Sequence, residues 1–177
     1  MKPFDIISEN RASYPVEDMA KSLVGFLIGS KETVATAESC TGGLIGGAIT
    51  SVSGASAVYG QGYITYANSA KEKLLGVKQE TLETLGAVSV ETAFQMAEGV
   101  CKASGSPLGI AVTGIAGPGG GTPQKPVGLV YIGICYKTNT FVYECHFGGN
   151  REKVREGTVF TALRLAYEII LETKEEK

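Results

Sequence analysis

The side chain best suited to nucleophilic chemistry is the hydroxyl of Ser39, which lies in the segment Glu38–Gly43. An apolar stretch precedes this segment and a run of small residues follows it, so we expect the serine at a strand-to-helix turn. Thr41, Gly42 and Gly43 would then lie at a helix N-terminus, where free N–H groups and the helix dipole favour a phosphate or an oxyanion. The pattern Ser-x-x-Gly-Gly by itself is more typical of a capped turn.

A serine nucleophile needs a base, and Lys71 is the candidate for that role. A lysine accepts a proton when burial or a neighbouring cation lowers its pKa. Lys71 follows Tyr66–Ala70, where a predicted strand turns into a helix, and the end of that strand could face the same sheet edge as Ser39. Tyr66 would then relay a proton or orient the lysine. The commoner arrangement is a surface lysine that begins a helix, so this pairing is a hypothesis.

Two further side chains compete for catalytic roles. Cys40 is adjacent to Ser39, but no histidine accompanies it to lower its pKa, and we rank it below the serine. His146 lies within a predicted strand without an obvious acidic partner in the sequence. A lone histidine in a strand is more often structural than catalytic, so we expect neither residue to act.

Gly114–Pro126 is a second candidate loop, and it holds five of the 24 glycines and three of the six prolines. Glycines at this density let a backbone approach a ligand closely and adopt positive φ values. Loops of ~13 residues are uncommon in compact domains and are often functional. The alternative is a flexible connection.

Arg151 and Arg155 lie one turn apart at the start of the last predicted helix, so they share a face. A guanidinium binds phosphate through two parallel hydrogen bonds, and Arg151 is the candidate for such a contact. A solvated helix face is the alternative for both residues, and for Arg155 we prefer it.

The positions of these candidate residues depend on an alternation of helices and strands along the chain. Apolar periodicity predicts helices over 16–30, 44–50, 69–75, 79–85, 89–103 and 150–173, and strands over 33–37, 62–67, 108–113, 127–136 and 141–147. This order predicts a three-layer α/β/α sandwich with a mixed, mostly parallel sheet of about five strands. Ligands bind at the carboxyl ends of strands in such sheets, where both candidate loops lie. We expect residues 1–14 to form an irregular arm and 15–173 a single domain.

Composition excludes several classes of protein. The formal net charge of −2 argues against general nucleic-acid binding, which needs an excess of Lys and Arg. No apolar run approaches the ~20 residues of a membrane span, and residues 1–14 lack the apolar core of a signal peptide, so we expect a cytoplasmic protein. The four cysteines have no C-x-x-C spacing, and we expect reduced thiols and neither a metal nor another cofactor.

Four segments, taken in this order, resemble the CinA C-terminal domain family, which includes the PncC-type nicotinamide-nucleotide amidases. They are Ala37–Gly43, Tyr66–Lys71, Gly86–Ser89 and Thr113–Gly120. Lys125–Gly128 and Gly148–Arg151 extend the likeness, which runs from about Val16 to Leu171. Each segment is weak alone, but their order and spacing are specific.

The resemblance implies hydrolysis of nicotinamide mononucleotide to nicotinate mononucleotide and ammonia, without a cofactor. Ser39 would be the nucleophile, with Lys71 and Tyr66 as its partners. The substrate-binding residues would be Thr41, Gly42, Gly43, Thr113, Gly114, Ala116, Gly117 and, near the phosphate, Arg151. We expect a homo-oligomer. We expect no attached N-terminal CinA domain, and therefore not the ADP-ribose pyrophosphatase activity that is associated with that domain.

Other functions fit parts of the same pattern. The loops could hold a mononucleotide in a sensor that performs no chemistry, or the chain could be an interaction protein in competence or DNA-damage responses. A phosphatase or another hydrolase is less favoured, because no paired carboxylates or metal-ligand cluster stand out in the sequence. Release of ammonia distinguishes the amidase from the others.

Overall fold

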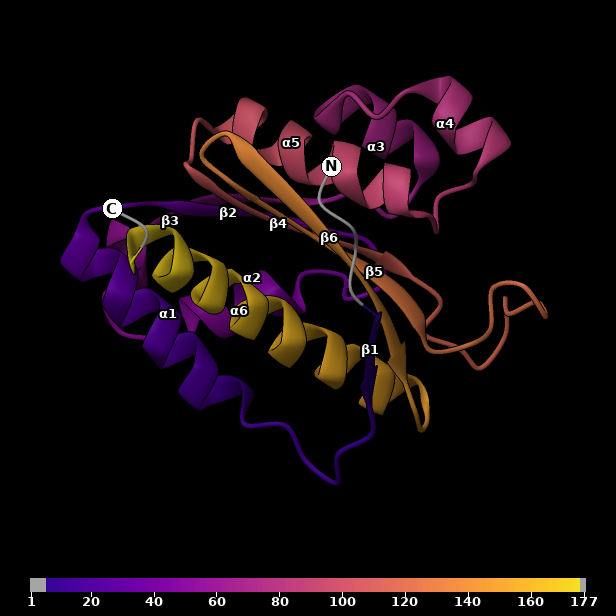
Figure 1. Cartoon of the computed structure of the whole chain (residues 1–177), viewed down its shortest axis with the longest axis horizontal. Coiled ribbons are helices and arrows are strands. Elements are labelled where there is room, and N and C mark those ends of the chain that lie inside the picture. Colours follow the sequence, from indigo (N-terminus) through magenta and orange to yellow (C-terminus); the bar gives the residue numbers. More distant parts are fainter. Residues whose placement is uncertain (1–5, 176–177) are drawn as a thin grey trace.

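Residues 6–175 are described by a computed structural model, in which helices cover both faces of a six-stranded sheet (Figure 1). The strand order is β1-β6-β5-β4-β2-β3. The strands are β1 (Ile6–Glu9), β2 (Val34–Glu38), β3 (Tyr59–Ile64), β4 (Leu108–Gly114), β5 (Leu129–Tyr136) and β6 (Asn139–Phe147). The helices are α1 (Val16–Ser30), α2 (Leu44–Thr50), α3 (Asn68–Leu75), α4 (Gln79–Thr84), α5 (Val90–Ser104) and α6 (Arg151–Glu175), with a 3₁₀ turn at Ala55–Ala57.

The sheet is mixed, as the order of elements predicts. The pairs β1–β6, β2–β3 and β2–β4 are parallel, whereas β4–β5 and β5–β6 are antiparallel. Strands joined through a crossover helix run parallel, and the two-residue turn between β5 and β6 makes a hairpin. The predicted three-layer α/β/α sandwich is confirmed.

Two strands differ from the sequence prediction. Ile6–Glu9 pairs in parallel with β6 and adds a sixth strand, where the sequence analysis expects an irregular arm. A four-residue strand is too short for a periodic signal, and the part of the arm before residue 6 lies outside the described residues. Strand β3 spans Tyr59–Ile64 rather than 62–67, because its pairing with β2 begins at Tyr59. Tyr66 therefore lies in the loop after β3.

Helices on both faces bury the centre of the sheet. Helices α1, α2 and α6 cover one face, and α3, α4 and α5 cover the other (Figure 1). Leu108–Thr113 of β4 is buried throughout, as expected for a strand covered on both sides. Leu23 and Leu163 are fully buried on the first face, and Met96 and Val100 on the second. No helix within residues 6–175 is both long and apolar enough to cross a membrane.

A close approach of two helices fixes the position of α3. Gly99 of α5 lies against the backbone of Leu75 at the end of α3, and a Cβ on Gly99 would overlap the carbonyl oxygen of Leu75. The missing side chain lets α3 and α5 pack with almost no space between their backbones. Because α3 also contains Lys71, this contact helps to position the candidate base.

We predict that Gly99→Ala destabilises the protein by about 1–3 kcal/mol, because the methyl group has to displace backbone rather than a flexible side chain. Gly25→Ala on α1 is the matched control, because a Cβ there meets nothing within 4 Å. The control should stabilise the protein by about 0.5–1 kcal/mol through helix propensity. Urea unfolding monitored by circular dichroism measures both, and equal stability of the two variants would contradict the prediction.

Candidate active site

The parallel strands β2, β3 and β4 end together at one edge of the sheet. Glu38, the last residue of β2, is in register with Ile64 of β3 and Val112 of β4. The ladder continues one step further, since the N–H of Ser39 donates to Val112 O (3.1 Å) and that of Thr65 donates to Glu38 O (2.9 Å). The sheet therefore delivers the β2–α2 turn and the β3–α3 loop to the same place.

The structure brings Ser39 and Lys71 into direct contact at this edge. Lys71 lies in the first turns of α3 and its side chain points back under the β3–α3 loop, where Nζ is 3.1 Å from Ser39 Oγ. Nζ also donates to the carbonyl oxygens of Thr65 (2.8 Å) and Tyr66 (3.4 Å). Both interacting side chains are buried: Lys71 is 1% exposed and Ser39 is 8% exposed.

The three partners of Lys71 determine how a neutral amine would be oriented. A neutral –NH₂ group has two donors and one lone pair. The carbonyl oxygens of Thr65 and Tyr66 can only accept, so they take the two N–H groups. The lone pair is then left for the hydroxyl proton of Ser39. Burial lowers the pKa of Lys71 to about 8, so a substantial neutral fraction exists near neutral pH.

Tyr66 contributes differently from the predicted proton relay. Its carbonyl oxygen accepts from Lys71, but its exposed side chain turns toward α6, where its hydroxyl accepts from Arg151 Nη2 at 3.5 Å. Arg151 Nη1 also donates to Gly117 O at 2.8 Å. The guanidinium therefore connects the β3–α3 loop with the glycine-rich loop and stays exposed beside both.

The N-terminus of α2 is already occupied by a buried carboxylate, that of Glu38. Its Oε2 accepts from Thr41 Oγ1 (2.6 Å) and from the N–H groups of Gly43 and Ile45 (3.0 Å each), and its Oε1 accepts from Gly46 N–H (2.8 Å). Glu38 is 1% exposed. The N–H of Gly43 therefore already has an acceptor within the chain, and the binding of a phosphate or oxyanion by Gly43 stays a prediction.

The two other predicted substrate contacts on this turn, Thr41 and Gly42, also stay predictions, and both residues have partners within the chain. Gly42 N–H donates to Ser39 O at 3.1 Å, and the hydroxyl of Thr41 is directed to Glu38. Gly42 and Gly43 have positive φ values of 62° and 103°, and this backbone conformation accounts for glycine at both positions. Within residues 6–175, the N–H of Thr41 has no acceptor from the protein.

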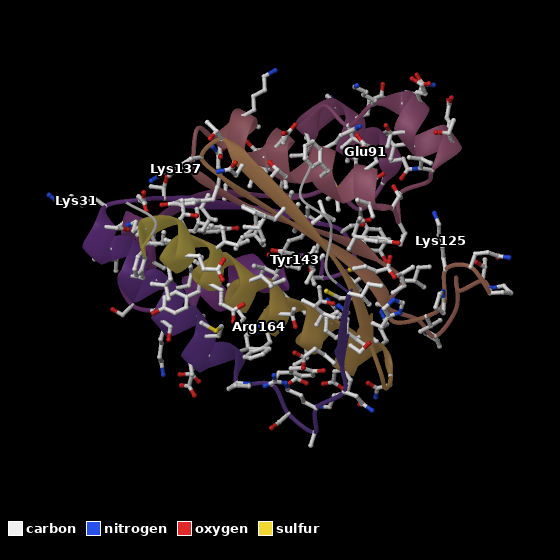
Figure 2. All side chains as sticks on the ribbon, viewed as in Figure 1. Lys31, Glu91, Lys125, Lys137, Tyr143 and Arg164 are labelled. Atoms are coloured by element: carbon white, nitrogen blue, oxygen red, sulfur yellow. The ribbon has the colours of Figure 1, made fainter. Side chains whose placement is uncertain are left out.

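The glycine-rich loop is shaped partly by packing. Thr113 is buried and its hydroxyl donates to Ala87 O (2.7 Å), which ties β4 to the loop before α5. A side chain on Gly114 would collide with the backbone of β5, so this glycine is required by strand pairing. Ala116 is buried and Gly117 has a φ of 80°. The outer part of the loop, which contains Lys125, projects from the sheet (Figures 1 and 2).

The sequence predicts a solvated helix face for Arg155, but the residue has a structural role in the folded protein. Its Nη2 donates to Thr41 O at 2.9 Å, and its Nε is buried without a partner among the described residues. The guanidinium therefore clamps the Ser39 turn from α6. In the sequence, the one-turn spacing places Arg155 on the same helix face as Arg151. A pair of solvated arginines has the same spacing, so the spacing does not predict the contact with Thr41.

The competing residues are not placed for catalysis. Cys40 is buried, and burial raises the pKa of its thiol to about 12. No acidic partner of His146 is obvious in the sequence. In the structure its Nε2 is 2.8 Å from the carboxylate of Glu144, on the same face of β6. In the sheet, β5 and β4 separate β6 from the β2 edge that holds Ser39.

Comparison with known proteins gives one consistent family. Residues 16–170 match the model of the CinA C-terminal domain. The "CinA-like protein" of Kosmotoga olearia is 49% identical over 147 residues, which are 83% of this chain and 36% of that protein. This chain spans between 33% and 40% of the length of the curated relatives that it matches.

Two solved structures are similar over most of their length. The competence/damage inducible protein CihA from Agrobacterium tumefaciens has a TM-score of 0.84 and 45% identity, with 88% of this chain and 96% of that chain covered. The competence damage-inducible protein A (ComA) from Klebsiella pneumoniae has a TM-score of 0.85 and 31% identity, with 88% and 97% covered.

We predict that Glu38→Gln lowers the free energy of unfolding by about 1–3 kcal/mol, because an amide NH₂ would face at least one buried N–H group that has no other acceptor. Glu72→Gln on the exposed face of α3 is the control and should change stability by less than about 0.5 kcal/mol. Urea unfolding at neutral pH measures both. Unchanged stability in Glu38→Gln would show that the carboxylate is not needed to hold the turn.

Proposed function

This chain belongs to the CinA C-terminal domain family, and from that premise we propose that it is a nicotinamide-nucleotide amidase. It would hydrolyse the carboxamide of nicotinamide mononucleotide and release nicotinate mononucleotide and ammonia. The single observation that supports this chemistry best is the buried contact between Lys71 Nζ and Ser39 Oγ at 3.1 Å. Most of the relatives are named for competence and damage, so the support for the amidase comes from the site.

The first half of the reaction forms an acyl-enzyme. Neutral Lys71 takes the hydroxyl proton of Ser39 while Oγ attacks the carboxamide carbon, and the carbonyl becomes a tetrahedral oxyanion. The resulting ammonium of Lys71 then donates that proton to the amide nitrogen as the C–N bond breaks. Ammonia leaves and Ser39 holds the acyl group as an ester.

The second half returns the enzyme to its starting state. Lys71 is neutral again after the departure of ammonia, so it deprotonates a water molecule that attacks the ester carbon. The C–O bond to Ser39 breaks, and its oxygen recovers a proton from Lys71. The carboxylic acid that forms loses its proton to solvent, and the resulting carboxylate is a poor acceptor for attack by the serine.

The oxyanion needs donors that the fold has not already used. The N–H groups of Gly42 and Gly43 have protein acceptors, so we assign the oxyanion to Thr41 N–H, which is free among the described residues, and to the loop at Ala116 and Gly117. One such donor contributes ~3–4 kcal/mol in enzymes that stabilise an oxyanion this way.

Recognition of the nucleotide would use the side of the site that faces α6. The guanidinium of Arg151 is exposed and lies between Tyr66 and Gly117, where it can bind the phosphate. Tyr66 holds Lys71 through its carbonyl oxygen, and its exposed ring is available to pack on the pyridine ring of the substrate. Thr113 and Gly114 support the loop behind this contact.

We expect purified protein to release ammonia from nicotinamide mononucleotide in the presence of EDTA. Ser39→Ala and Lys71→Met should each lower kcat/KM by at least about 100-fold, since one lacks the nucleophile and the other the base. Lys73→Met, on the exposed face of the same helix, is the matched control and should keep the activity. A coupled ammonia assay measures all four proteins.

Two results would contradict the amidase. Full activity in Ser39→Ala would exclude this nucleophile. Binding of nicotinamide mononucleotide by the native protein without ammonia release would instead favour a sensor that performs no chemistry. Circular dichroism of each variant separates a catalytic defect from loss of the fold.

The base hypothesis also predicts the pH profile. Lys71 acts only when deprotonated, and burial lowers its pKa to about 8, so kcat/KM should rise as the pH passes through about 8 and level off above it. The unperturbed pKa of lysine would place this rise near 10.4. Steady-state rates between about pH 6 and 10 measure the profile. A flat profile across this range would mean that the ionisation of Lys71 does not limit the reaction.

A further inference from the structure

Two cysteines from different elements meet on the face of the sheet that α5 covers. Cys101 lies in the last turns of α5 and Cys135 lies in β5. Cys101 Sγ donates to Cys135 O at 3.6 Å, so the two cysteines are in direct contact. This pair is separate from Ser39, and its chemistry does not depend on the proposed amidase activity.

The register of the sheet explains why the thiols are neighbours. Gly109 of β4 is directly opposite Cys135 in the antiparallel ladder, so a side chain on Gly109 would share a face with that of Cys135. A Cβ on Gly109 would lie only 2.7 Å from Cys101 Sγ. The sulfur of Cys101 therefore lies in the space that a side chain on Gly109 would need, next to the cross-strand position held by Cys135. We expect a change of rotamer to bring the two sulfurs within bonding distance.

The pair borders a surface cavity, with Cys101 half-buried and Cys135 only 5% exposed. Both cysteines line a cavity of about 430 Å³, together with Glu98, Lys102, Lys137, Thr138 and Thr140. Lys137 is at the turn between β5 and β6, close to the end of α5 (Figure 2). Among the charged groups around the cavity, Glu98 opposes the thiolate form of both cysteines, and the ammonium of Lys137 is paired with Glu32 at 3.2 Å.

The other cysteines lack these features. Cys40 and Cys145 are buried in the core on the other side of the sheet, where burial raises the pKa of each thiol to about 12. A thiol of that kind is inert toward oxidants because the thiolate is the reactive form. The thiols of Cys101 and Cys135 thus border a common cavity, and the other two thiols serve as internal controls.

We propose that Cys101 and Cys135 form a peroxide-reactive dithiol that closes to an intramolecular disulfide. The thiolate of Cys135 attacks one oxygen of a hydroperoxide, which forms an S–O bond, breaks the O–O bond and releases hydroxide or an alkoxide. The thiolate of Cys101 then attacks the sulfenic sulfur of Cys135, which forms the S–S bond and releases hydroxide. With hydrogen peroxide, two thiols lose two electrons and two protons, and the peroxide is reduced to two molecules of water.

The order of attack follows from the hydrogen bonds of the pair. The contact with Cys101 lowers the pKa of Cys135, and Thr140 lowers it further, whereas the same contact and burial raise the pKa of Cys101. Cys135 is therefore the attacking thiolate and Cys101 the resolving thiol. After the first step, loss of the Cys135 thiolate removes the interaction that raises the pKa of Cys101.

The test uses the full chain, reduced and freed of reductant, and treated with a low molar excess of hydrogen peroxide under denaturant-free conditions. We expect the loss of two of the four thiols, a mass decrease of about 2 Da, and one cross-linked peptide pair containing Cys101 and Cys135. Cys145→Ala is the matched control and should oxidise in the same way. With dimedone present, Cys101→Ser should give an adduct on Cys135, because the sulfenic acid has no resolving thiol.

Several results would overturn the proposal. Four intact thiols after treatment would exclude a reactive pair, and a cross-link that includes Cys40, Cys145 or a second chain would exclude this pairing. A dimedone adduct on Cys101 in Cys135→Ser, without one on Cys135 in Cys101→Ser, would reverse the assigned roles. The measurements on the native chain need no variant, so they remain decisive if a substituted protein fails to fold.

Discussion

The turn that holds Ser39 depends on a buried carboxylate. Glu38 ends β2 and immediately accepts the first free N–H groups of α2, so a charge that would be costly in the core is stabilised by backbone donors. The strand and the helix are thereby locked at a fixed angle, with Ser39 between them. Arg155 holds the same turn from α6 through Thr41 O. The rigidity of the candidate nucleophile thus comes from groups that do not touch a reacting atom.

The basic group of the site, the amine of Lys71, is in a different environment from the carboxylate of Glu38. Lys71 is as deeply buried as Glu38, but its partners are two carbonyl oxygens and a hydroxyl rather than a carboxylate. Desolvation is therefore not offset by an ion pair, and the pKa of the amine falls. Close packing of α3 on α5 at Gly99 keeps the amine in this environment. The fold supplies a base in this way without a histidine.

Local sequence patterns were sufficient to predict the helices, most of the strands and the main candidate site residues. Apolar periodicity predicted every helix to within about a turn, because each helix of residues 6–175 has a buried stripe or a marked end. It did not predict β1 and shifted β3, since both are edge strands whose ends are set by pairing rather than by their own pattern. Ser39 and Lys71 were found as residues of the right type at strand-to-helix junctions. Glu38 was missed, although its position before a helix start was a usable signal.

The sequence by itself determined the fold class, the family resemblance and the choice of Ser39 and Lys71, because these depend on residue type and on spacing along the chain. Only the tertiary structure decided which hydrogen-bonding groups remain free. Lys71 and Ser39 are 32 residues apart, and Arg155 and Thr41 are 114 apart, so neither contact is encoded in a local pattern. Desolvation and hydrogen-bond partners are properties of the assembled layers. For that physical reason the helix N-terminus that looked open in the sequence is filled by Glu38 in the folded protein.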